Sequence, residues 1–256
     1  VCDVMPLHGL NRAFVAQGLK VMARRDRTGL AALMEIASVT KAPDAFSCGF
    51  ALGPRINAGG RIAEAALGLN LLRCTDRTVA RQMAERLDAV NRRRQDVEAT
   101  ILDRAMEQAA AQKEAGRGVI LLAGRDWHPG VVGIVAGRIK ERFNRPTLVG
   151  AEQEDGSIKG SGRSVPGLDL GTVIIAARQA GMLKTGGGHA MAAGFSLEAE
   201  RLEEFHSFLD TRLPQATDLP DTVDLLLDAV VSVSGASAEL AQQMGAMAPF
   251  GAGNPE

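Results

Sequence analysis

The sequence contains little cysteine, few aromatic residues and no long apolar run. Its three cysteines, at positions 2, 48 and 74, stand singly among 256 residues. Such isolated cysteines argue against a disulfide framework or a zinc cluster and favour a reducing compartment, for which the cytoplasm is the default. No apolar run approaches the roughly 20 residues that span a bilayer, so no membrane contact is expected.

Charge of either sign is not in excess. Lysine and arginine number 29, aspartate and glutamate number 30, and the formal net charge is −1. A protein that coats nucleic acid through charge alone is strongly basic. The aromatic share of 4% is too small for an obvious base-stacking platform. Any contact with nucleic acid is therefore expected in a local pocket of phosphate-binding groups.

What is present is the pattern of an α/β protein with several parts. Over residues 1–73 we expect a short strand that ends at Pro6, a glycine-rich loop at 49–61, and helices at 11–24, 28–38 and 63–72. A single long helix is predicted over 75–115, with Thr75 or Asp76 as its cap and Gly116 after its end. Its apolar residues keep to one stripe, and the charged opposite face suits solvent or a cleft between domains.

Residues 117–213 alternate between short apolar runs and helical patterns. Strands are expected at 119–123, 146–150, 158–164 and 192–197, and helices at 131–143, 170–180 and 198–213. This alternation predicts a separate α/β domain. After a polar linker at 214–220, a strand at 223–233 and a helix near 238–247 are expected to begin a further domain. Since both ends of the sequence fall within predicted elements or turns, the chain is expected to be part of a longer protein.

The segment Gly186-Gly187-Gly188-His189 is the most informative candidate site. Three glycines between a predicted helix and a predicted strand leave backbone N–H groups free to form an anion-binding nest. His189 adds a donor that can be charged near neutral pH. The alternative interpretation is a flexible turn with an incidental histidine.

A second candidate site is Ser161-Gly162-Arg163-Ser164, at the end of a predicted strand. A planar guanidinium between two hydroxyls suits a phosphate group. The alternative is a polar strand end with a surface arginine. Because α/β domains gather functional loops at one edge of the sheet, the two segments are expected to act together.

The segment Gly53–Arg61 is a third candidate, with Arg55, Asn57 and Arg61 among small residues. A structural turn needs the glycines and the proline but has no use for both arginines, so anion contact is favoured. On the long helix, Asn91, Gln95 and Glu98 share a face beside three arginines. That face can line a cleft, although a solvated surface is the favoured interpretation.

Asp3 is the least obvious candidate. A lone aspartate at a strand end is commonly a cap or a turn former. Metal-dependent hydrolases, however, hold Mg²⁺ or Mn²⁺ with carboxylates at strand ends. The sequence has no other cluster of carboxylates and histidines, so further ligands of such a metal site would lie upstream of Val1.

Taken together, these segments resemble the DHH phosphoesterase superfamily, and within it the exonucleases specific for single-stranded DNA. The matching segments, in chain order, are Cys2–Leu7 with Asn11-Arg12, Leu52–Arg61, Trp127–Ile134, Gly160–Ser164, Gly187–Ala190 with Ala192–Gly194, and Pro249–Glu256. They span essentially the whole chain, and several ordered matches are far more specific than any one. Two departures stand out: Gly59 occupies a position where alanine is common, and the DHH signature itself is absent.

The resemblance implies a fold and an activity. Residues 1–73 would be the C-terminal part of the DHH catalytic domain, 74–116 the connecting helix, 117–213 the DHH-associated domain, and 221–256 the start of an OB-type domain. The implied activity is 5′→3′ hydrolysis of single-stranded DNA in repair and recombination, with two Mn²⁺ or Mg²⁺ ions. The chain by itself is expected to be inactive, because most metal ligands would lie upstream.

The resemblance also implies roles for residues and partners. Asp3 would be a catalytic metal ligand, and His189 would act at the catalytic site. The phosphates of the strand would be bound by Arg55, Asn57, Arg61, Ser161, Arg163, Ser164, Gly187, Gly188 and His189. The implied substrate is single-stranded DNA with a 5′ phosphate. A single-strand-binding protein and a helicase are candidate partners of a protein expected to be monomeric.

Two alternatives stay open at this point. One is a relative from the same superfamily that cleaves oligoribonucleotides or cyclic dinucleotides, although such enzymes lack the long helix and the Gly53–Arg61 segment. The other is a non-catalytic nucleic-acid-binding scaffold. The presence of Asp3 argues mildly against the scaffold, since a decayed centre need not keep a metal ligand.

Overall fold

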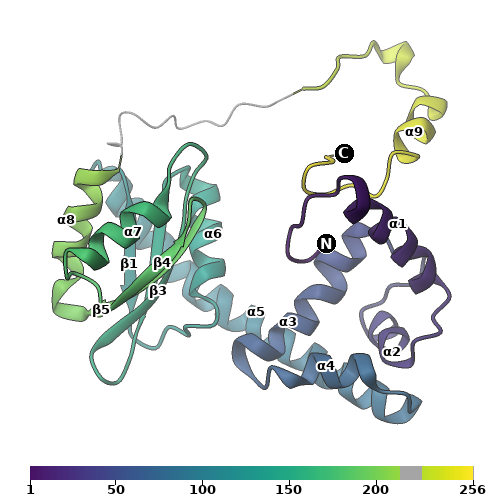
Figure 1. Ribbon diagram of the computed structural model, residues 1–256, viewed down its shortest axis with the longest axis horizontal. Helices are drawn as coiled ribbons and strands as arrows, with labels where there is room; N and C mark the ends of the chain where they lie inside the picture. Colours follow the sequence, from purple (N-terminus) through teal and green to yellow (C-terminus); the bar gives the residue numbers. More distant parts are fainter. Residues whose placement is uncertain (214–226, 256) are drawn as a thin grey trace. The chain divides into compact units, whose positions relative to one another are not determined.

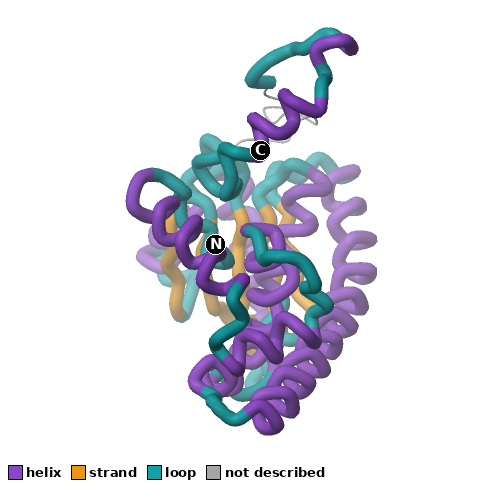
Figure 2. The backbone as a smooth tube through the Cα atoms, turned by 90° about the vertical axis from the view of Figure 1, so that its right-hand side faces the viewer, coloured by secondary structure: helices purple, strands orange, loops and turns teal. Residues whose placement is uncertain are grey.

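The computed structural model describes residues 1–213 and 227–255, and the chain divides into two compact units. The first unit comprises residues 1–94 with 226–256, and the second comprises residues 95–225. Within the described residues, every strand belongs to the second unit, whereas the first is built of helices and loops (Figures 1 and 2). The linker predicted at 214–220 lies outside the described residues.

The helices of the first unit largely follow the sequence pattern. They are α1 (Gly9–Ala23), α2 (Thr28–Ile36), a π-helical turn (Ser47–Leu52), α3 (Gly53–Ile62), α4 (Ala66–Arg73) and α9 (Ala238–Gly245). Their core combines leucines of α2 and α4, such as Leu33 and Leu71, with side chains of the long helix, namely Ala80, Ala84 and Leu87. The helices expected at 11–24, 28–38, 63–72 and 238–247 are thereby confirmed.

Helix α5 (Arg77–Glu114) confirms the long helix and extends from the first unit into the second. Asp76 caps its start, since its carboxylate accepts the Val79 N–H at 2.9 Å. Gly116 follows its end with a φ of +79°, a conformation that glycine adopts without steric cost. The cap and the terminating glycine were both visible in the sequence.

Three expectations for the first unit were wrong. The loop expected at 49–61 is helical, because Gly53 and Gly59 let α3 pack closely against neighbouring chain and Pro54 suits a first helical turn. No strand precedes Pro6, and residues 227–232 with the 3₁₀ turn Val233–Gly235 are not extended in a sheet. In both places the described residues offer no partner strand. Residues 223–226 lie outside the description.

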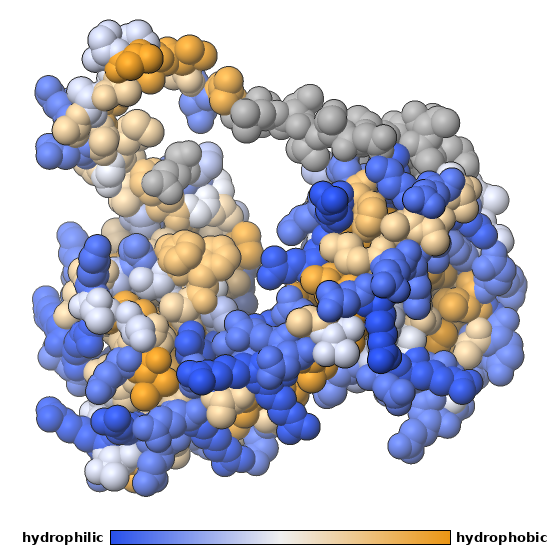
Figure 3. All heavy atoms as spheres, turned by 180° about the vertical axis from the view of Figure 1, so that it is seen from behind, coloured by the Kyte–Doolittle hydropathy of each residue, from blue (hydrophilic) through white to orange (hydrophobic). Residues whose placement is uncertain are grey.

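Apolar side chains remain exposed in that C-terminal segment. Leu227, Val230 and Val233 are largely accessible, and Figure 3 shows hydrophobic atoms in orange beside the grey stretch. The backbone N–H of Leu7 donates to the carbonyl of Ala252 at 2.7 Å, so the C-terminal turn packs on the N-terminal loop within the first unit.

The second unit is a five-stranded sheet with helices on both faces (Figure 1). Its elements are β1 (Ile120–Gly124), α6 (Val132–Phe143), β2 (Thr147–Glu152), β3 (Ser157–Arg163), α7 (Leu170–Gln179), β4 (Thr185–His189), β5 (Ala192–Glu198) and α8 (Leu202–Arg212). The strand order is β1-β2-β3-β5-β4, with β1 and β2 parallel and the other pairs antiparallel. The predicted α/β domain is confirmed, and β4 is an additional strand.

The two helix layers cover different parts of the sheet. Helices α7 and α8 bury Leu170, Ile174 and Phe205 against the strands, and this cluster is the main core of the unit. Helix α6 packs against β2 and β3 on the opposite face. Gly133 of α6 lies against Ser161 of β3, whereas Gly162, the next residue of β3, lies against Leu170 of α7, and successive residues of a strand point to opposite faces. On the α6 side of the sheet, Gly194 of β5 and His189 of β4 are exposed.

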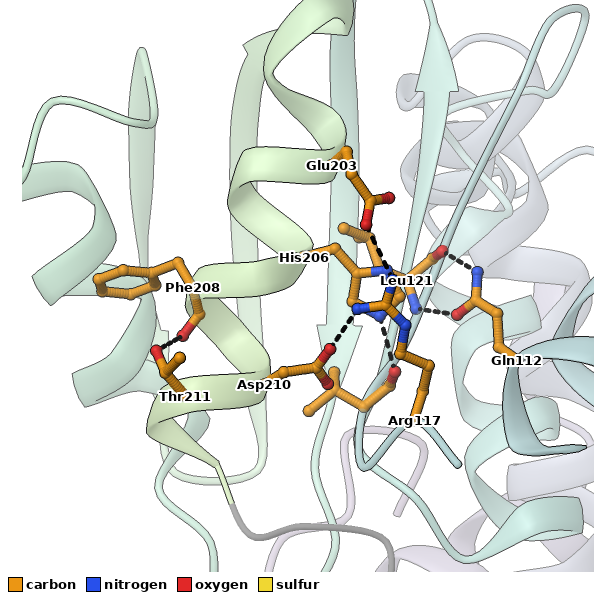
Figure 4. A network of polar contacts seen from close by, with 9 residues as sticks. Gln112, Arg117, Leu121, Glu203, His206, Phe208, Asp210 and Thr211 are labelled. Atoms are coloured by element: carbon orange, nitrogen blue, oxygen red, sulfur yellow. Dashed lines mark hydrogen bonds and ion pairs between the residues drawn. The ribbon is translucent and has the colours of Figure 1, made fainter. Parts of the chain in front are cut away.

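The edge strand β1 is held by side chains from α5 and the loop after it (Figure 4). The amide of Gln112 donates to the Leu121 carbonyl at 2.7 Å and accepts the Leu121 N–H at 3.0 Å, as a neighbouring strand would. Arg117 binds Glu203 at 2.8 Å and also Asp210, both on α8. The two Gln112 bonds cover the outer backbone edge of β1 at Leu121, where another strand could otherwise pair, whereas Arg117 links the loop to α8.

Candidate functional site

Four of the residues predicted to bind phosphate in the second unit, Ser161, Arg163, Gly187 and His189, lie on one face of the sheet. Strands β3, β5 and β4 are neighbours, and directly paired residues point to the same side. Two successive rows across these strands are Arg163–Ala192–His189 and Ser161–Gly194–Gly187. Arg163 and His189 therefore flank a floor that carries only a methyl group in one row and no side chain in the next.

The floor between these side chains is open. A Cβ atom added to Gly187 would meet nothing within 4 Å, and one added to Gly194 would meet only a backbone oxygen at 4.0 Å. On the β3 side, a Cβ at Gly133 of α6 would lie 3.0 Å from a guanidinium nitrogen of Arg163 and 3.3 Å from the Ser161 hydroxyl. A glycine at this position of α6 gives Arg163 and Ser161 room on the sheet.

The prediction of a nest at Gly186-Gly187-Gly188-His189 was wrong. These residues form β4, and none of the three glycines has a positive φ, so the alternating conformation of a nest is absent. Close packing explains the glycines instead: a Cβ at Gly188 would lie 2.3 Å from the carbonyl oxygen of Ala192. As an edge strand, β4 still directs part of its backbone N–H groups away from β5.

His189 is exposed at the end of β4 and lies close to the start of α7. Asp169 caps that helix and accepts the N–H of Thr172 at 3.0 Å and its hydroxyl at 2.9 Å. These bonds from Thr172 lower the pKa of Asp169, and the charge of nearby His189 lowers it further. The carboxylate is thus a fixed negative charge close to His189.

Ser164 has a different position from Ser161. Its side chain is 1% exposed, and its hydroxyl donates to the carbonyl of Leu168 at 2.9 Å. Its backbone N–H donates to Met191 at 3.0 Å. The structure therefore places Ser164 inside the turn that leads from β3 towards α7, away from the open floor.

Trp127 and His128 hold the turn before α6. The Trp127 ring is buried against Gly124, where an added Cβ would lie 2.3 Å from the indole. The Nδ1 atom of His128 accepts the Gly130 N–H at 3.0 Å. Both side chains therefore stabilise the turn that precedes α6.

In the first unit, α3 separates the three residues expected to bind phosphate together. Asn57 and Arg61 are four residues apart, so they share one face of the helix, and both are exposed. Arg55 lies on another face, where its Nε donates to Asp88 at 2.8 Å and its Nη1 to the carbonyl of Ala51 at 2.7 Å.

The middle of α5 buries polar side chains where a solvated face was expected. Asp88, Asn91, Arg94 and Glu98 are all at most 9% exposed, so the solvated interpretation was wrong for Asn91 and Glu98. Gln95 is exposed as expected. Asp88 was missed as a functional candidate altogether. The one signal available was its place four residues before Arg92, a spacing typical of helical ion pairs.

Residues 115–215 match the family model of the DHHA1 domain. The chain is 43% identical over 213 residues to the "Single-stranded-DNA-specific exonuclease RecJ" of Dickeya dadantii, which covers 80% of this chain and 37% of that protein. All of the chain also superposes on RecJ crystal structures from Thermus thermophilus, with TM-scores of 0.87 and 0.88 at 32% identity. The chain belongs to the RecJ family.

The RecJ resemblance covers a part of the longer proteins. The chain spans 37% of the Dickeya RecJ and 39% and 37% of the two Thermus structures, which are complexes with Mg²⁺ and Mn²⁺ respectively. The fold class expected from the sequence is confirmed by this likeness. None of the described helices is long and apolar enough to cross a membrane.

The described residues do not provide a complete set of ligands for Mg²⁺ or Mn²⁺, the ions bound in the RecJ structures. Asp3 is exposed in an N-terminal turn, and no group of three or more acidic, histidine or cysteine side chains gathers among the residues described. Mg²⁺ demands near-octahedral oxygen coordination, to which Asp3 contributes one carboxylate. The described residues by themselves therefore do not complete a site for such a metal.

Proposed function

We propose that this chain supplies the strand-binding part of a metal-dependent exonuclease that degrades single-stranded DNA from a 5′ phosphate. The main support is the open floor between Arg163 and His189, two donors on one face of the sheet with glycine and alanine between them. A phosphate can approach that backbone closely because no large side chain stands over it. The names of the relatives support the choice of substrate.

In this proposal, each residue has a defined task. Arg163 and Ser161 hold a phosphate at the β3 side, and His189 holds it from β4. Because N–H directions alternate along a strand, one of the two residues Gly187 and Gly188 adds an N–H group that points away from β5. Asn57 and Arg61 contact a further phosphate from the exposed face of α3. Ser164 supports the turn that positions Arg163. Asp3 is one ligand of a Mn²⁺ or Mg²⁺ site completed by residues outside the described ones.

The decisive experiment measures hydrolysis by the full-length protein that carries this sequence. We expect it to degrade long 5′-phosphorylated single strands when Mn²⁺ or Mg²⁺ is present, and to lose this activity with a chelator. Dinucleotides serve as the competing substrate. A preference for dinucleotides would replace the exonuclease with the small-substrate interpretation, and binding without any hydrolysis would support a scaffold.

A second experiment tests the sheet site. Arg163→Ala in the full-length protein should weaken strand binding about tenfold or more, as expected for loss of a charge-assisted contact to phosphate. Arg125→Ala is the matched control, because Arg125 is exposed in the same unit and pairs with Glu152 at 3.1 Å. Equal binding by both variants would remove Arg163 from the site.

The 256-residue chain alone is expected to bind divalent metal weakly and to leave DNA intact, because Asp3 by itself is a poor metal site. Calorimetric titration with Mn²⁺ and a nuclease assay check this. Manganese-dependent degradation of DNA by the pure chain would contradict it. Roles in repair and recombination, a cytoplasmic location, a monomeric state and contacts with a single-strand-binding protein or a helicase belong to the same proposal.

A further inference from the structure

Asp88 brings two guanidinium groups together inside the first unit. Arg55 of α3 donates its Nε to Oδ1 of Asp88 at 2.8 Å, and Arg92 of α5 donates an Nη2 to Oδ2 at 2.8 Å. Both oxygens of one carboxylate are thus used, one by each arginine. The Arg55 and Arg92 side chains come from different helices and are neighbours only because Asp88 lies between them.

The burial of the three side chains is unequal. The Asp88 side chain is 8% exposed, that of Arg55 is 19% exposed, and that of Arg92 is 75% exposed. A buried carboxylate has to be neutralised, and one guanidinium is enough for that purpose. The second guanidinium leaves the cluster with a net positive charge, and that excess lies on the accessible side, at Arg92.

The hydrogen-bond donors of the pair are only partly used. Arg55 donates its Nε to Asp88 and its Nη1 to the carbonyl of Ala51. Its Nη2 has no partner among the described residues. Arg92 donates from one nitrogen, Nη2, to Asp88. Two neighbouring guanidiniums with unused N–H groups can each donate a charge-assisted hydrogen bond to the same phosphate.

We propose that Arg55 and Arg92, held together by Asp88, form a binding site for a phosphodiester of the DNA strand. Asp88 is a positioning residue, since it acts through the two arginines and does not touch the strand. The site rests on the proposed function and adds Arg92 and Asp88 to it. It differs from the exposed face of Asn57 and Arg61, because Arg55 lies on another side of α3.

The first test compares Arg92→Gln with Arg93→Gln in the full-length protein. Both changes remove one positive charge from adjacent exposed positions of α5, but only Arg92 contacts Asp88. Affinity for a 5′-phosphorylated oligonucleotide is measured by fluorescence anisotropy at several salt concentrations. We expect Arg92→Gln to weaken binding roughly tenfold and to reduce the salt slope by about 0.7, the value for one phosphate contact on a single strand. Arg93→Gln should change neither quantity appreciably.

The second test uses Asp88→Asn, for which charge and positioning predict opposite signs. Removal of a negative charge would tighten DNA binding if net charge alone mattered. If Asp88 positions the two arginines, the loss of its charge weakens binding by about the same factor as Arg92→Gln. Asp88→Glu should recover part of the affinity. Thermal unfolding of each variant shows whether the protein is folded at the assay temperature.

A double-mutant cycle completes the test. If Asp88 acts through Arg92, Asp88→Asn combined with Arg92→Gln should bind the strand about as well as the weaker single variant. Additive losses, equal effects of Arg92→Gln and Arg93→Gln, or tighter binding by Asp88→Asn would each overturn the proposal. If Asp88→Asn does not fold, the Arg92 and Arg93 comparison still decides. Failure of the proposed function would differ, since hydrolysis of single strands would then be absent in the unaltered protein.

Discussion

Two glycine-rich segments contain candidate site residues, and they adopt different secondary structures. Gly53–Arg61 forms helix α3, whereas Gly186–His189 forms the edge strand β4. Both were expected to be irregular, because glycine weakens helices and strands alike. In each segment, some glycines are needed for close packing and others face open space. In this chain, therefore, glycine-rich motifs contain positions of close backbone packing but do not by themselves predict a helix, a strand or a turn.

The largest expected effect comes from Gly188→Ala in β4. The new Cβ would lie 2.3 Å from the Ala192 oxygen and 2.5 Å from the Ala193 Cα, and backbone atoms of a paired strand cannot move aside cheaply. We expect a loss of about 1–3 kcal/mol in the free energy of unfolding, typical of overpacking. Urea denaturation of the chain, followed by circular dichroism, measures it.

Gly187→Ala is the control for that variant. Its new Cβ would meet nothing within 4 Å, so stability should change by less than about 0.5 kcal/mol. Because the methyl group would stand over the open floor, strand binding by the full-length protein should fall. Equal destabilisation by both alanines would show that β4 is held by something other than close backbone packing.

A pair of neighbouring substitutions makes the same comparison in α3. Gly59→Ala places a Cβ 2.8 Å from the Glu64 carbonyl oxygen and should destabilise the chain. Gly60→Ala meets only the Ala65 Cβ at 3.9 Å and should stabilise it by about 0.5–1 kcal/mol, since alanine is the better helix former. Thermal melts of the two variants should shift in opposite directions, and shifts of the same sign would contradict the packing of α3.

The smallest expected effect concerns pH and the cap of α7, the helix packed against β4. Bonds from Thr172 lower the pKa of Asp169 below its usual value, whereas α3 has no side-chain cap. A lowered pKa in the folded state means that the stabilisation is present above about pH 4 and is lost as the pH falls through the folded pKa. Asp169→Asn, which cannot titrate, should reduce the fall in melting temperature between about pH 5 and pH 2. A pH dependence identical to that of the unaltered chain would exclude Asp169 as a contributor.

Much of the fold could be predicted from local pattern. The long helix was found with its cap and its terminal glycine, because apolar periodicity and capping are properties of nearby residues. Strands β1, β2, β3 and β5 and the helices between them followed for the same reason. The segments before Pro6 and at 227–233 were wrongly expected to be strands, since a strand also requires a partner that the pattern does not contain.

The candidate site divides in the same way. Residue type and spacing were enough to select Ser161, Arg163 and His189 as candidates. That they lie on one face of the sheet depends on the register of β3, β5 and β4, which the sequence motifs did not specify. The pairing of Arg55 with Asp88 was not predicted, because 33 residues separate them along the chain. Nothing in local sequence distinguishes an arginine that faces a carboxylate from one that faces solvent.

By itself, the sequence determined the long helix, strands β1, β2, β3 and β5, and which side chains are chemically suited to phosphate, because periodicity, capping and donor chemistry depend on residues a few positions apart. Only the tertiary structure decided that Gly186–His189 is a strand, that Ser164 is buried in a turn, and that Asp88 joins two arginines. Those outcomes depend on the close approach of segments distant in the chain, where a missing Cβ or a buried charge determines what can pack.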